Sequence, residues 1–223
     1  MAKGRERLVC SETDLVAHDI EIDHAICGRS LFAPDEPRLA EKGAHSSSPT
    51  FYFVLHDLLG KLDPTSRTHL LDVGCGTGRV LAYWLWQGLP GQVTGIELDP
   101  EAAAVARSWS AKYDNLHVVE GNVLEHDLSP YTDFYLFNPF DPSILKRFIE
   151  AVEAQVTRPV TVIHMSDNGD TWWYVGRPGW TQVDEGTFYT YQNARGYQIK
   201  VYQCHQHYTV WRFDPAGRQA DAL

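Results

Sequence analysis

The sequence predicts an α/β protein with a doubly wound, mostly parallel sheet that closes in antiparallel strands. Between residues 51 and 165, short apolar runs alternate with helical segments of about ten to fifteen residues, as in parallel strands joined by right-handed crossovers. After Met165 the helical pattern stops, and β-like segments separated by Gly and Asn follow. A single sheet, with parallel strands before Met165 and antiparallel strands after it, would account for both parts of the sequence.

The first part of the chain is polar and weakly patterned. We expect a cover or lid segment over residues 1–48, followed by a single domain over residues 49–223. Within the cover, DIEID (residues 19–23) alternates as an edge strand would, and residues 30–49 resemble a loop. FYFVLHDLLGKL then places apolar residues at helical spacing over residues 51–62.

The alternating region supplies the predicted parallel strands and their helices. The strands are expected at residues 69–73, 92–98, 116–121, 133–138 and 159–165, with helices at 79–89, 99–113 and 142–152. Asp99 and Asp141 are expected N-caps, because each precedes a proline at the first helical position. Beyond Met165, strands are expected at residues 180–186, 188–192, 197–203 and 207–213.

Composition limits the function classes. The 223 residues are 43% apolar, which suits one packed domain, and the formal charge of -10 disfavours nucleic acid as a partner. The four cysteines form no CxxC pair, so they predict neither a zinc site nor a disulfide framework. Because no signal-like or membrane-spanning apolar run is present, we expect a soluble, cytoplasmic protein.

A glycine loop stands between the first strand and its helix. LLDVGCGTGRV places glycines at positions 74, 76 and 78, where the chain can take positive φ and approach a ligand closely. The next strand ends in Glu97, where an acid in this fold binds ribose hydroxyls. The spacing is GxGxG, whereas nicotinamide enzymes usually show GxGxxG.

LDVGCGTG followed by GIELDP resembles the first two motifs of class I S-adenosylmethionine-dependent methyltransferases. The resemblance covers about residues 50–165 and implies a seven-stranded sheet with S-adenosylmethionine as cofactor. It also implies a set of cofactor-binding residues: Asp72, Gly74, Cys75, Gly76, Gly78, Glu97, Leu98, Asn122, Val123 and Asn138. Asn122 departs from the family, which usually has an acid there, although an amide oxygen can also accept from an adenine amino group.

The fourth predicted strand ends in Asn138, Pro139 and Phe140. NPF resembles, imperfectly, the Asn-Pro-Pro-aromatic motif of amino-methyltransferases, in which an amide oxygen and a proline carbonyl accept from the target amine. The second proline is missing here, so the alternative is a strand end with Phe140 in the core. We expect these three residues to contact the methyl acceptor, and no general base is identified.

Two further features carry weaker hypotheses. WWY, at residues 172–174, could wall a substrate pocket, although most aromatics of the last third are expected to fill the far side of the sheet. His205 and His207 lie two residues apart, but no third ligand accompanies them, so no metal is predicted.

The function predicted from sequence is methyl transfer from S-adenosylmethionine to a small molecule or a protein side chain. Three alternatives stay open: a nonenzymatic S-adenosylmethionine-binding protein, a nicotinamide oxidoreductase, and an aminopropyl transferase. The last usually has a strong acid where this chain has Asn138. The sequence does not indicate the acceptor atom or the oligomeric state.

Overall fold

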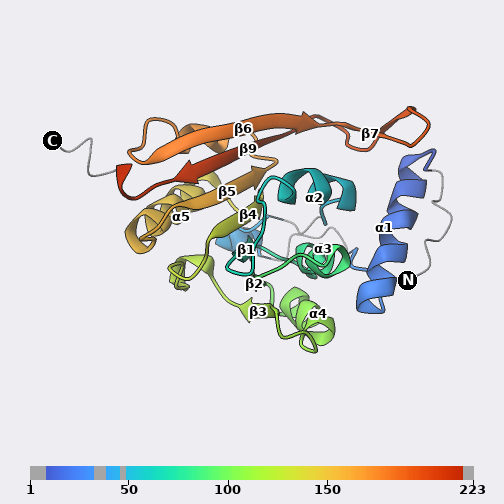
Figure 1. The fold of residues 1–223 in the computed structure, drawn as a ribbon, viewed down its shortest axis with the longest axis horizontal. Coiled ribbons are helices and arrows are strands. Elements are labelled where there is room, and N and C mark those ends of the chain that lie inside the picture. Colours follow the sequence, from blue (N-terminus) through green and yellow to red (C-terminus); the bar gives the residue numbers. More distant parts are fainter. Residues whose placement is uncertain (1–8, 33–38, 46–48, 218–223) are drawn as a thin grey trace.

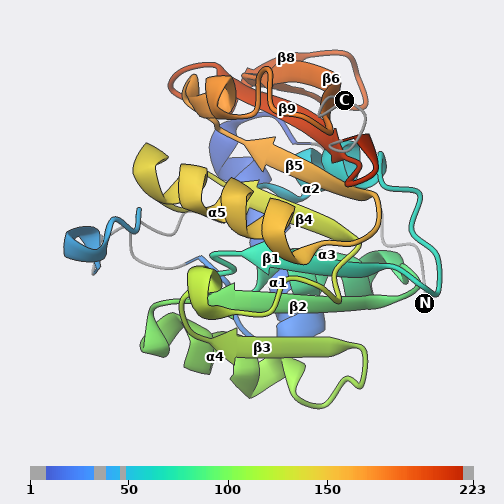
Figure 2. The ribbon, with the colours of Figure 1, turned by 90° about the vertical axis from the view of Figure 1, so that its left-hand side faces the viewer.

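A computed structural model describes residues 9–32, 39–45 and 49–217. Its centre is a seven-stranded sheet, seen edge-on in Figure 1 and face-on in Figure 2. The strands are β1 (His69–Val73), β2 (Gln92–Glu97), β3 (Leu116–Glu120), β4 (Asp133–Phe137), β5 (Val160–Met165), β6 (Trp180–Phe188) and β9 (Gln206–Phe213).

The strand order is β3-β2-β1-β4-β5-β9-β6. β1 to β5 pair in parallel, and β9 runs antiparallel between β5 and β6. From β1 the chain first adds β2 and β3 on one side of the sheet and then crosses to add β4 and β5 on the other side. The carboxyl ends of β1 and β4 therefore lie side by side at a topological switch point. The predicted fold class, a mostly parallel seven-stranded sheet with an antiparallel end, is confirmed.

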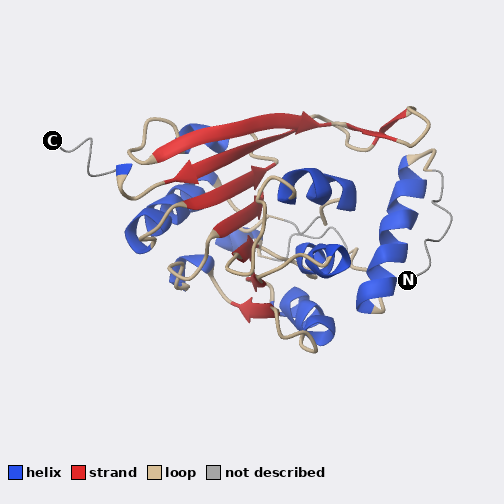
Figure 3. Ribbon diagram, in the orientation of Figure 1, coloured by secondary structure: helices blue, strands red, loops and turns tan. Residues whose placement is uncertain are grey.

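Helices cover both faces of the sheet (Figures 1 and 3). One face carries α1 (Glu12–Cys27), α2 (Tyr52–Leu59), α3 (Arg79–Gln87) and α4 (Pro100–Ser110), and the other carries α5 (Pro142–Gln155). Asp99 caps α4 by accepting from the N–H of Glu101, as predicted. Asp141 precedes α5, but its side chain makes no capping hydrogen bond.

The strand expected at residues 19–23 is wrong, because these residues lie in the middle of α1. Ser11 caps this helix by accepting from the N–H of Asp14, and Gly28 ends it in the left-handed conformation. Asp19 and Asp23 are four residues apart and therefore share one helix face, where both are buried. The polar positions of the alternating sequence DIEID include two buried acids that pair with a buried cation, and they do not mark the exposed face of a strand.

That partner is Arg79, the first residue of α3, whose side chain is 3% exposed. Its guanidinium donates to Asp23 at 2.6 Å and contacts Asp19 at 3.4 Å, while the Tyr52 hydroxyl donates to Asp23 at 2.8 Å. Buried charges are tolerated only when they are paired in this way. The network fixes α1 against the helix that follows the glycine loop.

The C-terminal third is antiparallel, as predicted. A hairpin of β7 (Thr190–Gln192) and β8 (Gln198–Lys200) follows β6 and packs on α2, where the rings of Tyr191 and Phe53 are 5.2 Å apart. WWY belongs to a 3-10 turn, η3 (Asp170–Trp173), and its last residue is buried. Across the described part of the chain, no helix has the length and apolarity needed to span a membrane.

Candidate functional site

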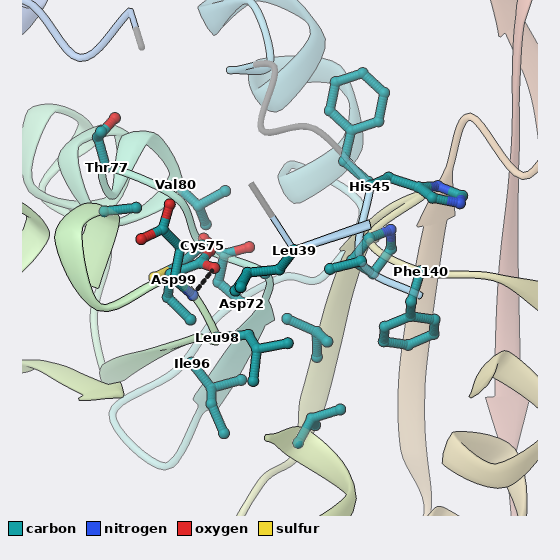
Figure 4. A pocket seen from close by; sticks show the side chains of 18 of the residues that line it. Leu39, His45, Asp72, Cys75, Thr77, Val80, Ile96, Leu98, Asp99 and Phe140 are labelled. Carbon is teal, nitrogen blue, oxygen red and sulfur yellow. Dashed lines mark hydrogen bonds between the residues drawn. The ribbon is translucent and has the colours of Figure 1, made fainter. Parts of the chain in front are cut away.

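A cavity of about 450 Å³ opens at the carboxyl ends of β1, β2 and β4. Figure 4 shows Asp72, Ile96, Leu98 and Asp99 toward one end of it, and His45 and Phe140 toward the other. Its volume lies within the range of small-molecule and cofactor sites. Of the predicted site residues, nine line it: Asp72, Gly74, Cys75, Glu97, Leu98, Asn122, Val123, Pro139 and Phe140.

The glycine loop is held against β2 by its backbone. The N–H groups of Gly74 and Cys75 both donate to the Ile96 carbonyl, at 2.9 and 3.1 Å. Gly74, Gly76 and Gly78 have φ of 74°, 53° and 96°, the left-handed region that side chains disfavour. The turn therefore requires its three glycines, although Gly76 and Gly78 are not among the cavity-lining residues.

Close packing adds a second reason for glycine at Gly78 and at Gly95 of β2. A Cβ on Gly78 would lie 2.9 Å from the Trp109 ring, whose Nε1 donates to the Thr77 carbonyl. A Cβ on Gly95 would lie 2.6 Å from the sulfur of Cys75. The side chain of Cys75 thus packs onto β2 beneath the loop, and its pKa is raised by burial.

Glu97 ends β2 with both carboxylate oxygens anchored. Oε2 accepts from the N–H of Gly76 at 2.7 Å, and Oε1 accepts from the N–H of Asp99 at 2.8 Å. Burial raises the pKa of Glu97, and these hydrogen bonds partly offset the effect. Since a carboxylate has about four acceptor positions, it is oriented by backbone N–H groups and is still able to accept from a hydroxyl donor.

Asp72, the residue before the loop, is 3% exposed on the cavity wall. Burial raises its pKa well above the usual range, and the charge of nearby Glu97 raises it further. Two carboxylates with raised pKa values in one cavity are typical of a functional site, because folding gains nothing from burying them.

The third strand leads to Asn122, which caps a 3-10 turn, η2 (Val123–Glu125), by accepting from the N–H of Leu124 at 3.0 Å. The N–H of Gly121 donates to the carbonyl of Glu97 at the end of β2. Asn122 and Val123 line the cavity as predicted, while part of the amide's hydrogen-bonding capacity is used by the cap.

The end of β4 turns sharply. Asn138 has φ of 40°, and Phe140 is buried and packs 6.1 Å from the Phe148 ring. Asn138 is not among the cavity-lining residues, so its contact with acceptor or cofactor stays a prediction. The Asn138 carbonyl accepts from His45 Nδ1 at 2.9 Å, and the Pro139 carbonyl accepts from the His45 N–H at 3.1 Å.

Several residues from the first 50 positions line the cavity, and none of them was among the predicted site residues. Arg29, Ser30 and Phe32, just after α1, line the cavity, and so do Thr50 and the segment from Leu39 to His45. The hydroxyl of Thr77 in the glycine loop donates to the Leu31 carbonyl at 2.6 Å. The only available sequence signal was the paired acids of α1.

The weaker hypotheses have separate outcomes. Tyr174 is buried, and its ring stacks on that of Trp211 with centroids 4.9 Å apart. Trp172 is 57% exposed and stacks on Trp173 at 3.7 Å. None of the WWY residues 172–174 lines the cavity. His205 stacks on Tyr189 and His207 Nδ1 pairs with Asp167 at 2.8 Å, so the two histidines have different partners. Within the described ranges, no metal-binding group of three or more His, Cys, Asp or Glu side chains occurs.

Solved structures share the fold at low sequence identity. An RNA methyltransferase from Salinibacter ruber, crystallised with S-adenosyl-L-homocysteine, is 22% identical over 75% of this chain and 93% of its own, with a TM-score of 0.52. The putative methyltransferase YhhF from Escherichia coli is 18% identical over 84% and 93%, with a TM-score of 0.57. A protein solved in work on disulfide-to-thioacetal conversion during echinomycin biosynthesis is 16% identical over 92% and 97%, with a TM-score of 0.58.

No curated protein matches the chain. Residues 70–155, from β1 to the end of α5, match the model of a methyltransferase domain family, and this stretch contains the glycine loop, Glu97 and the end of β4. Residues 70–155 thus match a methyltransferase domain, and the strand order and the motifs agree with the class I S-adenosylmethionine-dependent type.

Proposed function

We propose that the chain transfers a methyl group from S-adenosylmethionine to a small molecule or a protein side chain held at the end of β4. The continuity of the cavity carries the proposal, since one wall holds Gly74 and Glu97 and another holds Pro139 and Phe140. Gly74 and Pro139 are close-packed, so the predicted cofactor loop and the predicted acceptor turn are adjacent.

The lining residues fit the cofactor. Glu97 would accept from the ribose hydroxyls, because its oxygens are oriented by Gly76 and Asp99 and retain acceptor capacity. The backbone of the glycine loop would lie against the methionine part, with Arg29 available to its carboxylate. Asn122 and Val123 would lie beside the adenine.

When bound, S-adenosylmethionine supplies an electrophilic methyl group on a sulfonium. The protein must then hold the acceptor in line with that methyl group and exclude competing water. Phe137, Pro139 and Phe140 provide an apolar wall for this purpose at the end of β4.

The Pro139 carbonyl, which would accept from a target amine, already accepts from the N–H of His45 and keeps one further acceptor position. Because this position does not distinguish one acceptor class from another, we base the acceptor class on charge. The net charge of -10 disfavours nucleic acid and favours a small molecule or protein side chain.

A thermal shift assay with S-adenosylmethionine, S-adenosylhomocysteine, NAD and NADP tests the cofactor. Only the first two ligands should raise the melting temperature, because binding to the folded state alone stabilises it. Glu97→Ala should abolish the shift. Glu120→Ala is the matched control, since Glu120 lies opposite Glu97 on β3 but is 48% exposed and pairs with Arg107.

Stabilisation by the nicotinamides alone would contradict the proposal. Labelled S-adenosylmethionine added with a metabolite or protein extract tests turnover. Cofactor binding without transfer to any component would instead support a nonenzymatic binding protein.

A further inference from the structure

The segment from Leu39 to His45 forms the wall of the cavity at its acceptor end. Leu39, Lys42, Gly43, Ala44 and His45 all line the cavity, around a 3-10 turn, η1 (Ala40–Lys42). Figure 4 shows His45 on the side of the cavity where Phe140 lies, and Leu39 between that side and Asp72. We call residues 39–45 the strap.

The strap is bonded to the turn after β4 by its backbone. The N–H of Asp141 donates to the Gly43 carbonyl at 3.0 Å, the N–H of His45 donates to the Pro139 carbonyl at 3.1 Å, and Ala44 bridges Phe140. Gly43 has φ of 73°, and a Cβ there would lie 2.6 Å from the Ile144 side chain. The strap therefore follows the surface of the turn closely.

The imidazole of His45 adds two contacts at the end of the strap. Nδ1 lies 2.9 Å from the Asn138 carbonyl, and Nε2 lies 3.1 Å from Oδ1 of Asp141. A carbonyl and an ionised carboxylate can only accept hydrogen bonds. Both ring nitrogens must donate to satisfy both partners, and only the imidazolium carries two N–H groups.

Other charges near His45 act in both directions. Asp141, at the start of α5, faces it directly. The pKa of Asp170 in η3 is raised by burial and by the charge of Asp167, and the nearby His45 opposes this rise. Lys42 of the strap and Arg147 of α5 line the same cavity and oppose a further positive charge. The carboxylate in hydrogen-bond contact is the dominant partner, because charge-assisted bonds weaken steeply with distance.

We propose that His45 is a positioning residue that, as an imidazolium, latches the strap over the acceptor end of the cavity and thereby sets the rate at which cofactor and product exchange. The proposal rests on the proposed function, because it needs S-adenosylmethionine in this cavity. The latch has both hydrogen bonds while the imidazole is protonated and loses one of them when the imidazole is neutral.

The test is the dissociation rate constant of tritiated S-adenosylhomocysteine, measured at about pH 5.5 and pH 8. The wild type should release the ligand about two- to fivefold more slowly at the lower pH, the usual effect of one partly exposed charge-assisted bond. His45→Ala should release it rapidly at both values. His45→Gln should be intermediate and independent of pH, since its amide can donate to one acceptor but carries no charge.

His205→Ala is the control, because this exposed histidine stacks on Tyr189 and does not line the cavity. Urea unfolding of the ligand-free variants checks that the strap, and not global stability, has changed. Normal binding with wild-type release rates in His45→Ala would overturn the latch alone. Failure of the folded wild type to bind S-adenosylhomocysteine at either pH would overturn the proposed function and the latch with it.

Discussion

Gly74 of the glycine loop lies so close to Pro139 after β4 that a Cβ built on Gly74 would be 2.9 Å from the Cβ of Pro139. Two non-bonded carbon atoms cannot stay less than 3 Å apart, so this contact depends on the absence of a side chain at Gly74. It joins the two sequence motifs that stand 65 residues apart in the numbering, from 74 to 139.

Gly74→Ala should therefore destabilise the fold by about 1–3 kcal/mol and weaken binding of S-adenosylhomocysteine. Gly176→Ala is the matched control, because Gly176 has nearly the same φ, 73° against 74°, with open space around it. Urea unfolding and calorimetry measure the two effects. Equal losses in both variants would show that backbone strain alone matters and that the contact with Pro139 does not.

Asp72→Asn should stabilise the ligand-free protein while weakening cofactor binding. Burial and the charge of Glu97 raise the folded-state pKa of Asp72 above the ordinary value of 3.8, so the folded state retains a proton that the unfolded state releases. Stability therefore falls as the pH rises from that value through the folded-state pKa. Because asparagine cannot ionise, the Asp72→Asn variant does not lose unfolding free energy in this way as the pH rises.

The gain in unfolding free energy for Asp72→Asn should consequently be larger at about pH 8 than at about pH 5. Urea unfolding at both values provides the measurement. Asp127→Asn is a control of opposite sign, because hydrogen bonds from Ser129 lower the pKa of that exposed carboxyl. An Asp72→Asn variant no more stable than the wild type at the higher pH would contradict the argument.

Asp23→Asn should cost about 3–5 kcal/mol of unfolding free energy, because it leaves the buried guanidinium of Arg79 with a weakened partner. Asp23 also accepts from the N–H of Leu31 at 2.9 Å, so the chain beside the cavity should loosen and bind the cofactor less tightly. Chemical denaturation measures the first effect.

The control for Asp23→Asn is Glu120→Gln, which breaks an ion pair of similar length, 2.8 Å, between side chains that are 45% and 48% exposed. A surface pair of this kind contributes about 1 kcal/mol or less. Comparable losses from the two substitutions would mean that the buried network does not hold α1 in place.

Local patterns were enough to predict the sheet and the cofactor end of the site. The glycine loop and Glu97 each belong to a strand and the turn that follows it, so their positions follow from periodicity and spacing. The predicted strand at residues 19–23 failed for the opposite reason. Its acids bind Arg79, 56 and 60 residues away, and no local pattern shows that pairing.

His45 illustrates the same limit at the acceptor end. It contacts Asn138 across 93 residues, from a segment whose sequence indicated only a loop. Asn138 itself was predicted correctly as a strand end, but its positive φ directs the chain so that Pro139 and Phe140, and not Asn138, form the wall. Backbone direction at a turn depends on the contacts around it.

The last prediction concerns the side chain of Asn138, for which Asn138→Gly is a cleaner change than alanine. Glycine accepts the φ of 40° without strain and keeps the carbonyl that receives His45, so only the amide group is lost. The variant should fold and bind S-adenosylhomocysteine normally but lose methyl transfer by about tenfold or more if the amide holds the acceptor. Transfer is measured with labelled S-adenosylmethionine and an extract containing the acceptor.

Asn168→Gly is the matched control, since Asn168 has φ of 50° after β5 and does not line the cavity. Unchanged transfer in Asn138→Gly would mean that the acceptor is held by the wall of Phe137, Pro139 and Phe140 without the amide.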